Sequence, residues 1–97
     1  MPTYLMLANW TEQGIKSYRD SVSRYREAQE SFSKLGVTLK DTYWVIGAYD
    51  IAGIVEAADD ETLTAGMLAL GSQGNIRTTT MRLFSADEME QIISRAS

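Results

Sequence analysis

The chain has 97 residues, of which 44% are hydrophobic and 23% charged, and its formal net charge at pH 7 is −4. These values predict one soluble globular domain over residues 1–97, and the negative charge argues against nucleic-acid binding. Because the chain contains no Cys and no His, it has no disulfides, zinc–sulfur sites or histidine-based catalysis, and we expect no cofactor and no metal.

The sequence also indicates where the protein works. No apolar run approaches the roughly 20 residues that a helix needs to span a bilayer. The first residues, Met1 to Tyr4, lack the basic segment that opens a signal peptide. We therefore expect a cytoplasmic protein without a membrane partner.

The N-terminal third predicts a strand followed by a helix. Residues 3–9 form a short apolar run that is typical of a strand. Apolar residues spaced three or four apart over residues 15–35 predict one long helix. An alternative stays open, because Asp20-Ser21 is a good N-cap pair: a short turn followed by a main helix that starts near Val22.

The middle of the chain predicts a hairpin. Residues 37–46 and 50–57 form two strands around Gly47-Ala48. A two-residue type II′ turn needs Gly at its first central position, because that position takes a positive φ. We therefore expect a tight type II′ turn at Gly47-Ala48.

A second helix and a fourth strand are expected next. The acidic run at residues 59–61 predicts a helix start, because acidic side chains are favoured at the positive end of the helix dipole. Residues 71–75 end this helix, and residues 75–83 predict the last strand. The inner face of the helix is predicted to carry Leu63, Met67 and Leu70.

The C-terminal segment predicts a further helix. Ser85 and Glu88 have the spacing of a capping box, in which each side chain bonds the other residue's backbone N–H. We expect this last helix to dock on the core through Met89, Ile92 and Ile93.

The order of elements predicts the fold. A β-α-β-β-α-β order plus a terminal helix is the split βαβ arrangement of ferredoxin-like α+β folds. Two right-handed crossovers give a four-stranded antiparallel sheet ordered 4-1-3-2, with both main helices on one face.

The strands are apolar on both faces, whereas a one-sided sheet alternates apolar and polar residues. In the first strand Tyr4 and Met6 point one way, and Leu5 and Leu7 point the other. An exposed apolar face is a liability on a monomer. We therefore predict that the chain pairs with itself through the uncovered face, as a homodimer or higher homo-oligomer. In the alternative, the last helix covers that face.

Three separated motifs are spread over nearly the whole chain. They are Asn9-Trp10-Thr11-x-Gln13-Gly14, Tyr43-Trp44-x-x-Gly47-x-Tyr49-Asp50, and Leu70-Gly71-x-x-Gly74-Asn75-Ile76-Arg77-Thr78. Together they resemble the GYD domain family. The resemblance implies a small bacterial protein whose fold is similar to the dimeric α+β barrels, and it implies no established activity. Residues 21–24 depart from the family, whose members often carry Pro at this helix start.

Two residue pairs from these motifs are candidates for a ligand site. Tyr49 and Asp50 either serve the turn, with Asp50 bonding nearby backbone amides, or lie at the rim of a cleft where Asp50 acts as a base. Asn9 and Trp10 either form a core edge and a helix cap or belong to a polar cluster for an aromatic ligand.

The basic residues of the last strand also have two possible roles, one structural and one in ligand binding. Arg77 and Arg82 lie on a predicted edge strand, where charges usually prevent unwanted pairing. Alternatively, an Arg at the mouth of the sheet pairs with a carboxylate or enolate. Arg24 and the other basic residues of the long helix are interpreted as a solvated face. The full set of candidate ligand-binding residues is Asn9, Trp10, Tyr43, Trp44, Tyr49, Asp50 and Arg77.

Three functions follow from these patterns. The first is a homo-oligomeric binding module with an aromatic-lined cleft for a small organic molecule, because Tyr and Trp are dense near the sheet without a catalytic constellation. The second, by fold analogy, is a cofactor-independent oxygenase or isomerase acting on a small aromatic or carbonyl substrate. The third is an assembly subunit. The enzyme hypothesis requires that five side chains converge on one cavity: those of Asn9, Trp10, Tyr49, Asp50 and Arg77.

Overall fold

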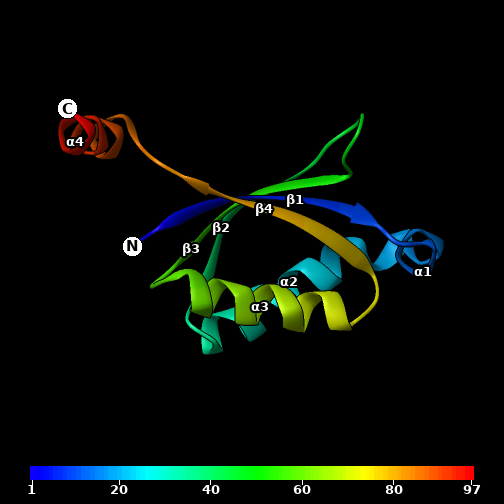
Figure 1. Cartoon of the computed structure of the whole chain (residues 1–97). Coiled ribbons are helices and arrows are strands. Elements are labelled where there is room, and N and C mark those ends of the chain that lie inside the picture. Colours follow the sequence, from blue (N-terminus) through cyan, green and yellow to red (C-terminus); the bar gives the residue numbers. More distant parts are fainter.

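The computed structural model describes residues 1–97 and contains one antiparallel sheet in the order β2-β3-β1-β4, with α2 and α3 on one face (Figure 1). The predicted strand order 4-1-3-2 and the ferredoxin-like α+β class are confirmed. None of the helices is both long and apolar enough to cross a bilayer. The elements are β1 (Thr3–Trp10), α1 (Glu12–Lys16), the 3-10 turn η1 (Tyr18–Asp20), α2 (Ser21–Lys34), β2 (Val37–Trp44), β3 (Ile51–Ala57), α3 (Asp60–Ser72), β4 (Ile76–Leu83) and α4 (Ala86–Ala96).

The core lies between the sheet and the two main helices. Alternate residues of β1 and β3 point into it, as the two-residue period of a strand requires. Phe32 from α2 and Leu63 from α3 close it from the helix side. The predicted inner face of α3 is confirmed, since Met67 and Leu70 also pack there. The buried cluster consists of Tyr4, Met6, Phe32, Val37, Leu39, Val55, Ala57 and Leu63.

The long helix expected over residues 15–35 is wrong, and the alternative with a separate main helix is confirmed. α1 ends at Lys16, and α2 begins at Ser21 after one 3-10 turn. The guanidinium of Arg24 donates to the carbonyl oxygen of Ser17 at 3.0 Å, which satisfies a backbone acceptor at the break. The apolar stripe is therefore interrupted, and Ile15 is exposed.

The hairpin is wider than the predicted type II′ turn. The backbone N–H of Val45 donates to the carbonyl oxygen of Asp50 at 2.9 Å, so the chain turns over four residues rather than two. Gly47 has the expected positive φ, at +118°. The turn is wide because Asp50 is held by β1: its N–H donates to the carbonyl oxygen of Ala8 at 2.9 Å.

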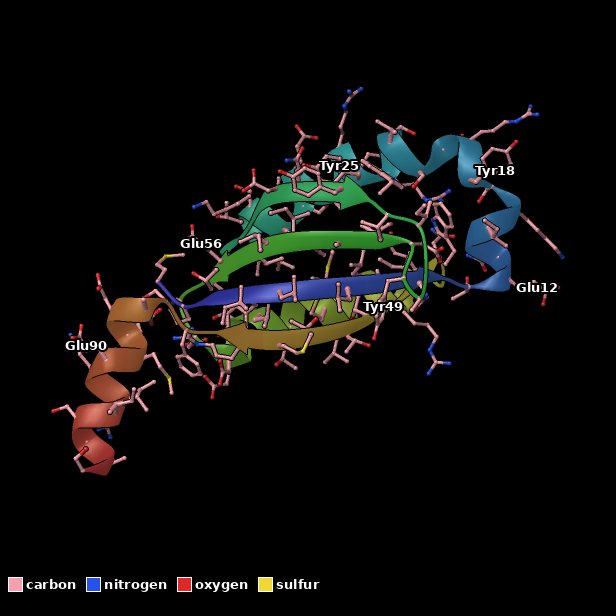
Figure 2. All side chains as sticks on the ribbon, turned by 90° about the horizontal axis from the view of Figure 1, so that it is seen from above. Glu12, Tyr18, Tyr25, Tyr49, Glu56 and Glu90 are labelled. Atoms are coloured by element: carbon pink, nitrogen blue, oxygen red, sulfur yellow. The ribbon has the colours of Figure 1, made fainter.

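The C-terminal helix departs most from the prediction. Its capping box at Ser85 and Glu88 is present, as predicted. The expected docking on the core is wrong: α4 has no buried residue, Met89 and Ile93 are 46% and 54% exposed, and Ile92 is only half-buried. Only Phe84 and Ser85 separate β4 from α4, and the helix therefore extends beyond the end of the sheet (Figures 1 and 2).

Candidate functional site

The three motif segments meet at one end of the sheet, which we call the corner: residues 9–14, 44–50 and 73–76. Thr11 follows β1 and binds the segment that precedes β4. Its N–H donates to the carbonyl oxygen of Asn75 at 3.0 Å, and its hydroxyl donates to the carbonyl oxygen of Gly74 at 2.5 Å. The side-chain amide of Gln13 donates to Oδ1 of Asn75 at 2.9 Å. Segments about sixty residues apart in sequence are thus joined at the corner.

Gly14 allows this close approach. It is buried in α1, and a Cβ built on it would lie 1.9 Å from the carbonyl oxygen of Asn75. Real Cβ atoms do not approach an oxygen that closely, so no other residue fits at this backbone position. Gly74 has a positive φ of +82°, which favours Gly in the facing segment as well. These motif glycines have a structural role.

A cavity of about 60 Å³ lies behind the corner, between the sheet and α2. Trp10 and Trp44 both line it, from the ends of β1 and β2. The rings of Trp44 and Tyr25 are nearly perpendicular, with their centroids 5.7 Å apart, and the indole N–H of Trp44 donates to the Ser21 hydroxyl at 2.9 Å. The lining residues are Met6, Trp10, Ser21, Arg24, Tyr25, Leu39, Thr42, Trp44, Ile51, Leu70, Gln73, Asn75 and Ile76.

Two residues of the cavity wall carry polar donors. The indole Nε1 of Trp10 is buried and has no hydrogen-bond partner. A buried donor without a partner costs about 1–3 kcal/mol, which a ligand acceptor would recover. Arg24 is half-buried in the cavity wall and holds the carbonyl and hydroxyl oxygens of Ser17, each at 3.0 Å. Its interpretation as part of a solvated face is therefore wrong.

The candidate residues in and next to the hairpin form hydrogen bonds with the backbone. The side-chain amide of Asn9 donates to the carbonyl oxygen of Ala48 at 2.9 Å. The carboxylate of Asp50 accepts from the backbone N–H of Trp10 at 2.9 Å. Tyr49 is half-buried in the same loop (Figure 2). Asn9 and Asp50 fasten the hairpin to β1, which agrees with the turn interpretation.

The remaining candidates, Tyr43 and Arg77, lie on the side of the sheet that faces away from the cavity. Arg77 pairs with Asn9 across β4 and β1, and Tyr43 pairs with Ala52 across β2 and β3. Directly paired residues share a face, and in both pairs it is the face without helices. Trp10 and Trp44 share the cavity, whereas Asn9, Tyr43 and Arg77 do not reach it. A single chain therefore does not bring together the set that the enzyme alternative requires.

The face of the sheet without helices is largely apolar, and we call it the open face: Leu5, Leu7, Ala52, Ile54, Met81 and Leu83. The register places Leu5 between Ile54 on β3 and Met81 on β4. Figure 2 looks down on this face, with the main helices behind the strands. No element of the chain covers it, and α4 extends past its end.

Sequence reasoning missed several cavity residues for a physical reason. Arg24 binds backbone carbonyls at a helix break, and a helical periodicity does not reveal such a break. Gln73 and Asn75 lie in a motif that the sequence did mark, but their neighbour Arg77 was the candidate chosen there. Gln13 and Asn75 lie in two of the three motifs, and their hydrogen bond joins these motifs in space. The presence of both motifs was therefore the one sequence signal that could have pointed to this part of the cavity wall.

Three titratable groups near the ends of α3 and α4 have shifted pKa values. Burial raises the pKa of Tyr4 to about 12, and its hydrogen bond to the Asp60 carboxylate at 2.5 Å acts in the same direction. Hydrogen bonds from Thr62 lower the pKa of the α3 cap Asp59. The backbone N–H of Ser85 lowers the pKa of Glu88 in the α4 capping box. The acidic residues at these helix starts act as caps.

Comparisons with known proteins found a matching family and a relative of similar length. The GYD domain family model matches residues 4–93. The glutamine synthetase and cystathionine beta-lyase binding protein of Thermus thermophilus is 33% identical over 82 residues, which are 84% of this chain and 86% of that protein.

Two solved structures resemble the fold. TTHA0845 from Thermus thermophilus is 28% identical with a TM-score of 0.53, over 89% of this chain and 96% of that chain. MtbAldR (Rv2779c) has a TM-score of 0.68 at 19% identity, over 87% of this chain. This chain spans about half of MtbAldR (52%), and that likeness shows the fold alone.

Proposed function

Because this chain belongs to the GYD domain family, whose fold by itself assigns no chemistry, we propose from its own geometry that it is a homodimeric binding module. Two copies pair through the open face, and each corner cavity binds a small organic molecule. The observation that carries the binding function is the buried, unpartnered indole N–H of Trp10 in the cavity wall.

The surface area supports pairing. The chain exposes 6545 Å², about 1,000 Å² more than the roughly 5,500 Å² expected of a compact monomer of its mass, 10.8 kDa. A standard interface buries about 800 Å² on each partner. The radius of gyration, 14.7 Å, also exceeds the roughly 12.5 Å expected for a compact chain of this length. The excess surface is enough for one stable interface.

The chemistry of the cavity favours a short carboxylate. Trp10 offers a buried N–H, and Arg24 carries a permanent positive charge in the same wall. The volume of about 60 Å³ is several times the roughly 10–15 Å³ that one water needs, yet below the roughly 150 Å³ of an apolar cavity that holds benzene. A carboxylate with a short apolar tail matches this size and offers an acceptor to the unpartnered N–H of Trp10.

Substitution of Ile54 with Lys tests the pairing. The variant places a charge at the centre of the open face, opposite Leu5. We expect wild type to be a dimer by light scattering coupled to gel filtration, and Ile54→Lys to be a monomer. Leu68→Lys is the matched control, because Leu68 is 69% exposed on α3, on the helix side of the sheet. A monomeric wild type would overturn the pairing.

Titration with propionate tests the cavity. We expect wild type to bind propionate but not 1-propanol by calorimetry, and Trp10→Phe to bind about tenfold more weakly because the N–H donor is lost. Leu68→Ala is the control, since Leu68 is exposed on α3 and does not line the cavity. A wild type that binds neither compound would overturn the ligand and leave the assembly subunit as the interpretation of a dimer.

A second candidate function is binding of another protein. It is favoured by the name of the Thermus relative, which is 33% identical over most of both chains. We expect co-elution in gel filtration with purified glutamine synthetase or cystathionine beta-lyase from the organism that encodes this chain. Separate elution from both enzymes would reject this candidate.

A further inference from the structure

Two apolar projections rise on the same side of the sheet, away from α2 and α3 (Figure 1). The first is the hairpin tip, where Val45 is exposed and Ile46 is completely exposed. The second is the C-terminal arm, where Phe84, Met89 and Ile93 are all exposed. Both views place the hairpin and α4 at opposite ends of the strands (Figures 1 and 2).

Neither projection is placed to cover its own chain. The hairpin is fastened in its raised position by Asn9, which donates to Ala48, and by Asp50, which binds β1. The start of α4 is fixed by its capping box, and Arg82 of β4 forms an ion pair with Glu88 at 3.4 Å. The link from β4 to α4 is only two residues long. The apolar side chains at both ends therefore stay in solvent in a single chain.

Twofold symmetry gives each projection a partner. A face-to-face dimer repeats each contact twice, because its interface is isologous. If the twofold axis runs along the strands, hairpin meets hairpin and α4 meets α4. The hairpin joins β2 to β3, whereas α4 follows β4 at the opposite edge of the sheet. An axis that runs obliquely across the strands exchanges both the ends and the edges of the sheet, so each hairpin then reaches the partner's α4. Of these arrangements, the oblique one brings two different apolar projections together without opposing identical raised loops.

We propose that the homodimer is locked by this exchange: the hairpin tip at Ile46 of each copy packs against α4 of the second copy, at Met89 and Ile93. This inference rests on the proposed pairing through the open face and adds its orientation. The exchanged contacts account for an amphipathic helix without a buried residue and for a fully exposed Ile at a loop tip.

The absence of Cys makes a direct test possible. Single variants Ile46→Cys and Ile93→Cys are mixed, unfolded in urea, refolded together and oxidised. A disulfide needs Cα atoms about 4–7 Å apart, so a bond in this mixture reports contact between two chains at these positions. We expect a covalent 46–93 heterodimer in high yield, and little covalent dimer from either variant alone. Leu68→Cys replaces Ile46→Cys in the control mixture and should give none.

A second variant separates this inference from the pairing itself. Ile46→Asp changes only the exposed tip, and we expect it to raise the dimer Kd about tenfold or more while the fold is retained. A dimer that forms no 46–93 bond and has the same Kd with Ile46→Asp would overturn the exchange and keep the pairing through the open face. A wild-type chain that is monomeric at all concentrations would overturn both.

Discussion

At the corner, hydrogen bonds join residues up to 64 positions apart, and Gly14 lies against a backbone carbonyl with no room for a side chain. At the other end of the sheet, α4 has no buried residue and is held by its capping box and one ion pair to β4. Both ends belong to one sheet, yet only the first is packed closely within the single chain.

The two ends differ in what their residues do: motif residues at the corner hold the fold together, whereas apolar residues of α4 are available for association. The motif residues at the corner are required by close backbone approach, so they specify the fold and shape the cavity. Met89 and Ile93 of α4 are exposed in the single chain, so they would gain stability by packing against another surface. Substitutions at the corner should therefore act on unfolding, whereas substitutions in α4 should act on association.

The largest effect is expected at Gly14. Ala at this position would bring a Cβ to 1.9 Å from the carbonyl oxygen of Asn75, which forces the two segments apart. We expect the free energy of unfolding to fall by about 3 kcal/mol or more in urea denaturation. Gly71→Ala is the matched control, because nothing lies within 4 Å of its added Cβ in α3, and it should leave stability unchanged or raise it. Equal losses in both variants would refute the close approach.

A smaller loss at the same end is expected for Asp50→Ala. The variant removes a carboxylate that accepts from the backbone N–H of Trp10 and leaves that donor without its partner. We expect a loss of about 1–3 kcal/mol in the free energy of unfolding, together with faster hydrogen exchange at Trp10. Asp41→Ala on exposed β2 should change little. A loss no larger than that of the control would show that the hairpin is held by other contacts.

The sequence was sufficient where a local rule decides the structure. The strand order follows from the order of elements, and the α4 start follows from the spacing of Ser85 and Glu88. The family resemblance was correct, because its motifs include the residues on which the corner depends. These features need only neighbouring residues or a general topological rule.

The sequence was insufficient where a distant partner decides. Asp50 bonds to β1 across 40 residues, and this contact widens a turn that local rules make tight. Arg24 ends up in a cavity wall because a carbonyl at a helix break needs a donor. The apolar face of α4 suggests docking, but its sequence does not say on which chain. The candidate residues were accordingly divided between the two faces of the sheet.

High pH should lower the stability of the core through Tyr4. Tyr4 pairs with Arg82 across β1 and β4, and its pKa is raised from 10.0 to about 12. The folded chain keeps the phenol neutral where the unfolded chain ionises it, so its contribution to stability is complete below pH 10 and is lost as the pH rises towards 12. Urea midpoints measured across this range should fall less in Tyr4→Phe than in wild type. Parallel curves would show that Tyr4 does not govern this loss.

The smallest effect is expected at the α4 cap. Ser85→Ala removes the side chain that accepts from the Glu88 N–H, which costs about 1 kcal/mol of local helix stability. In the monomeric Ile54→Lys background, we expect faster hydrogen exchange in α4 and an unchanged urea midpoint, because α4 contributes no buried residue to the core. Ser94→Ala, an exposed position in the same helix, should not accelerate exchange. If the midpoint falls together with α4 protection, α4 unfolds cooperatively with the sheet and the contrast between the two ends is wrong. If only α4 responds, its amphipathic face is free to serve association without affecting the fold.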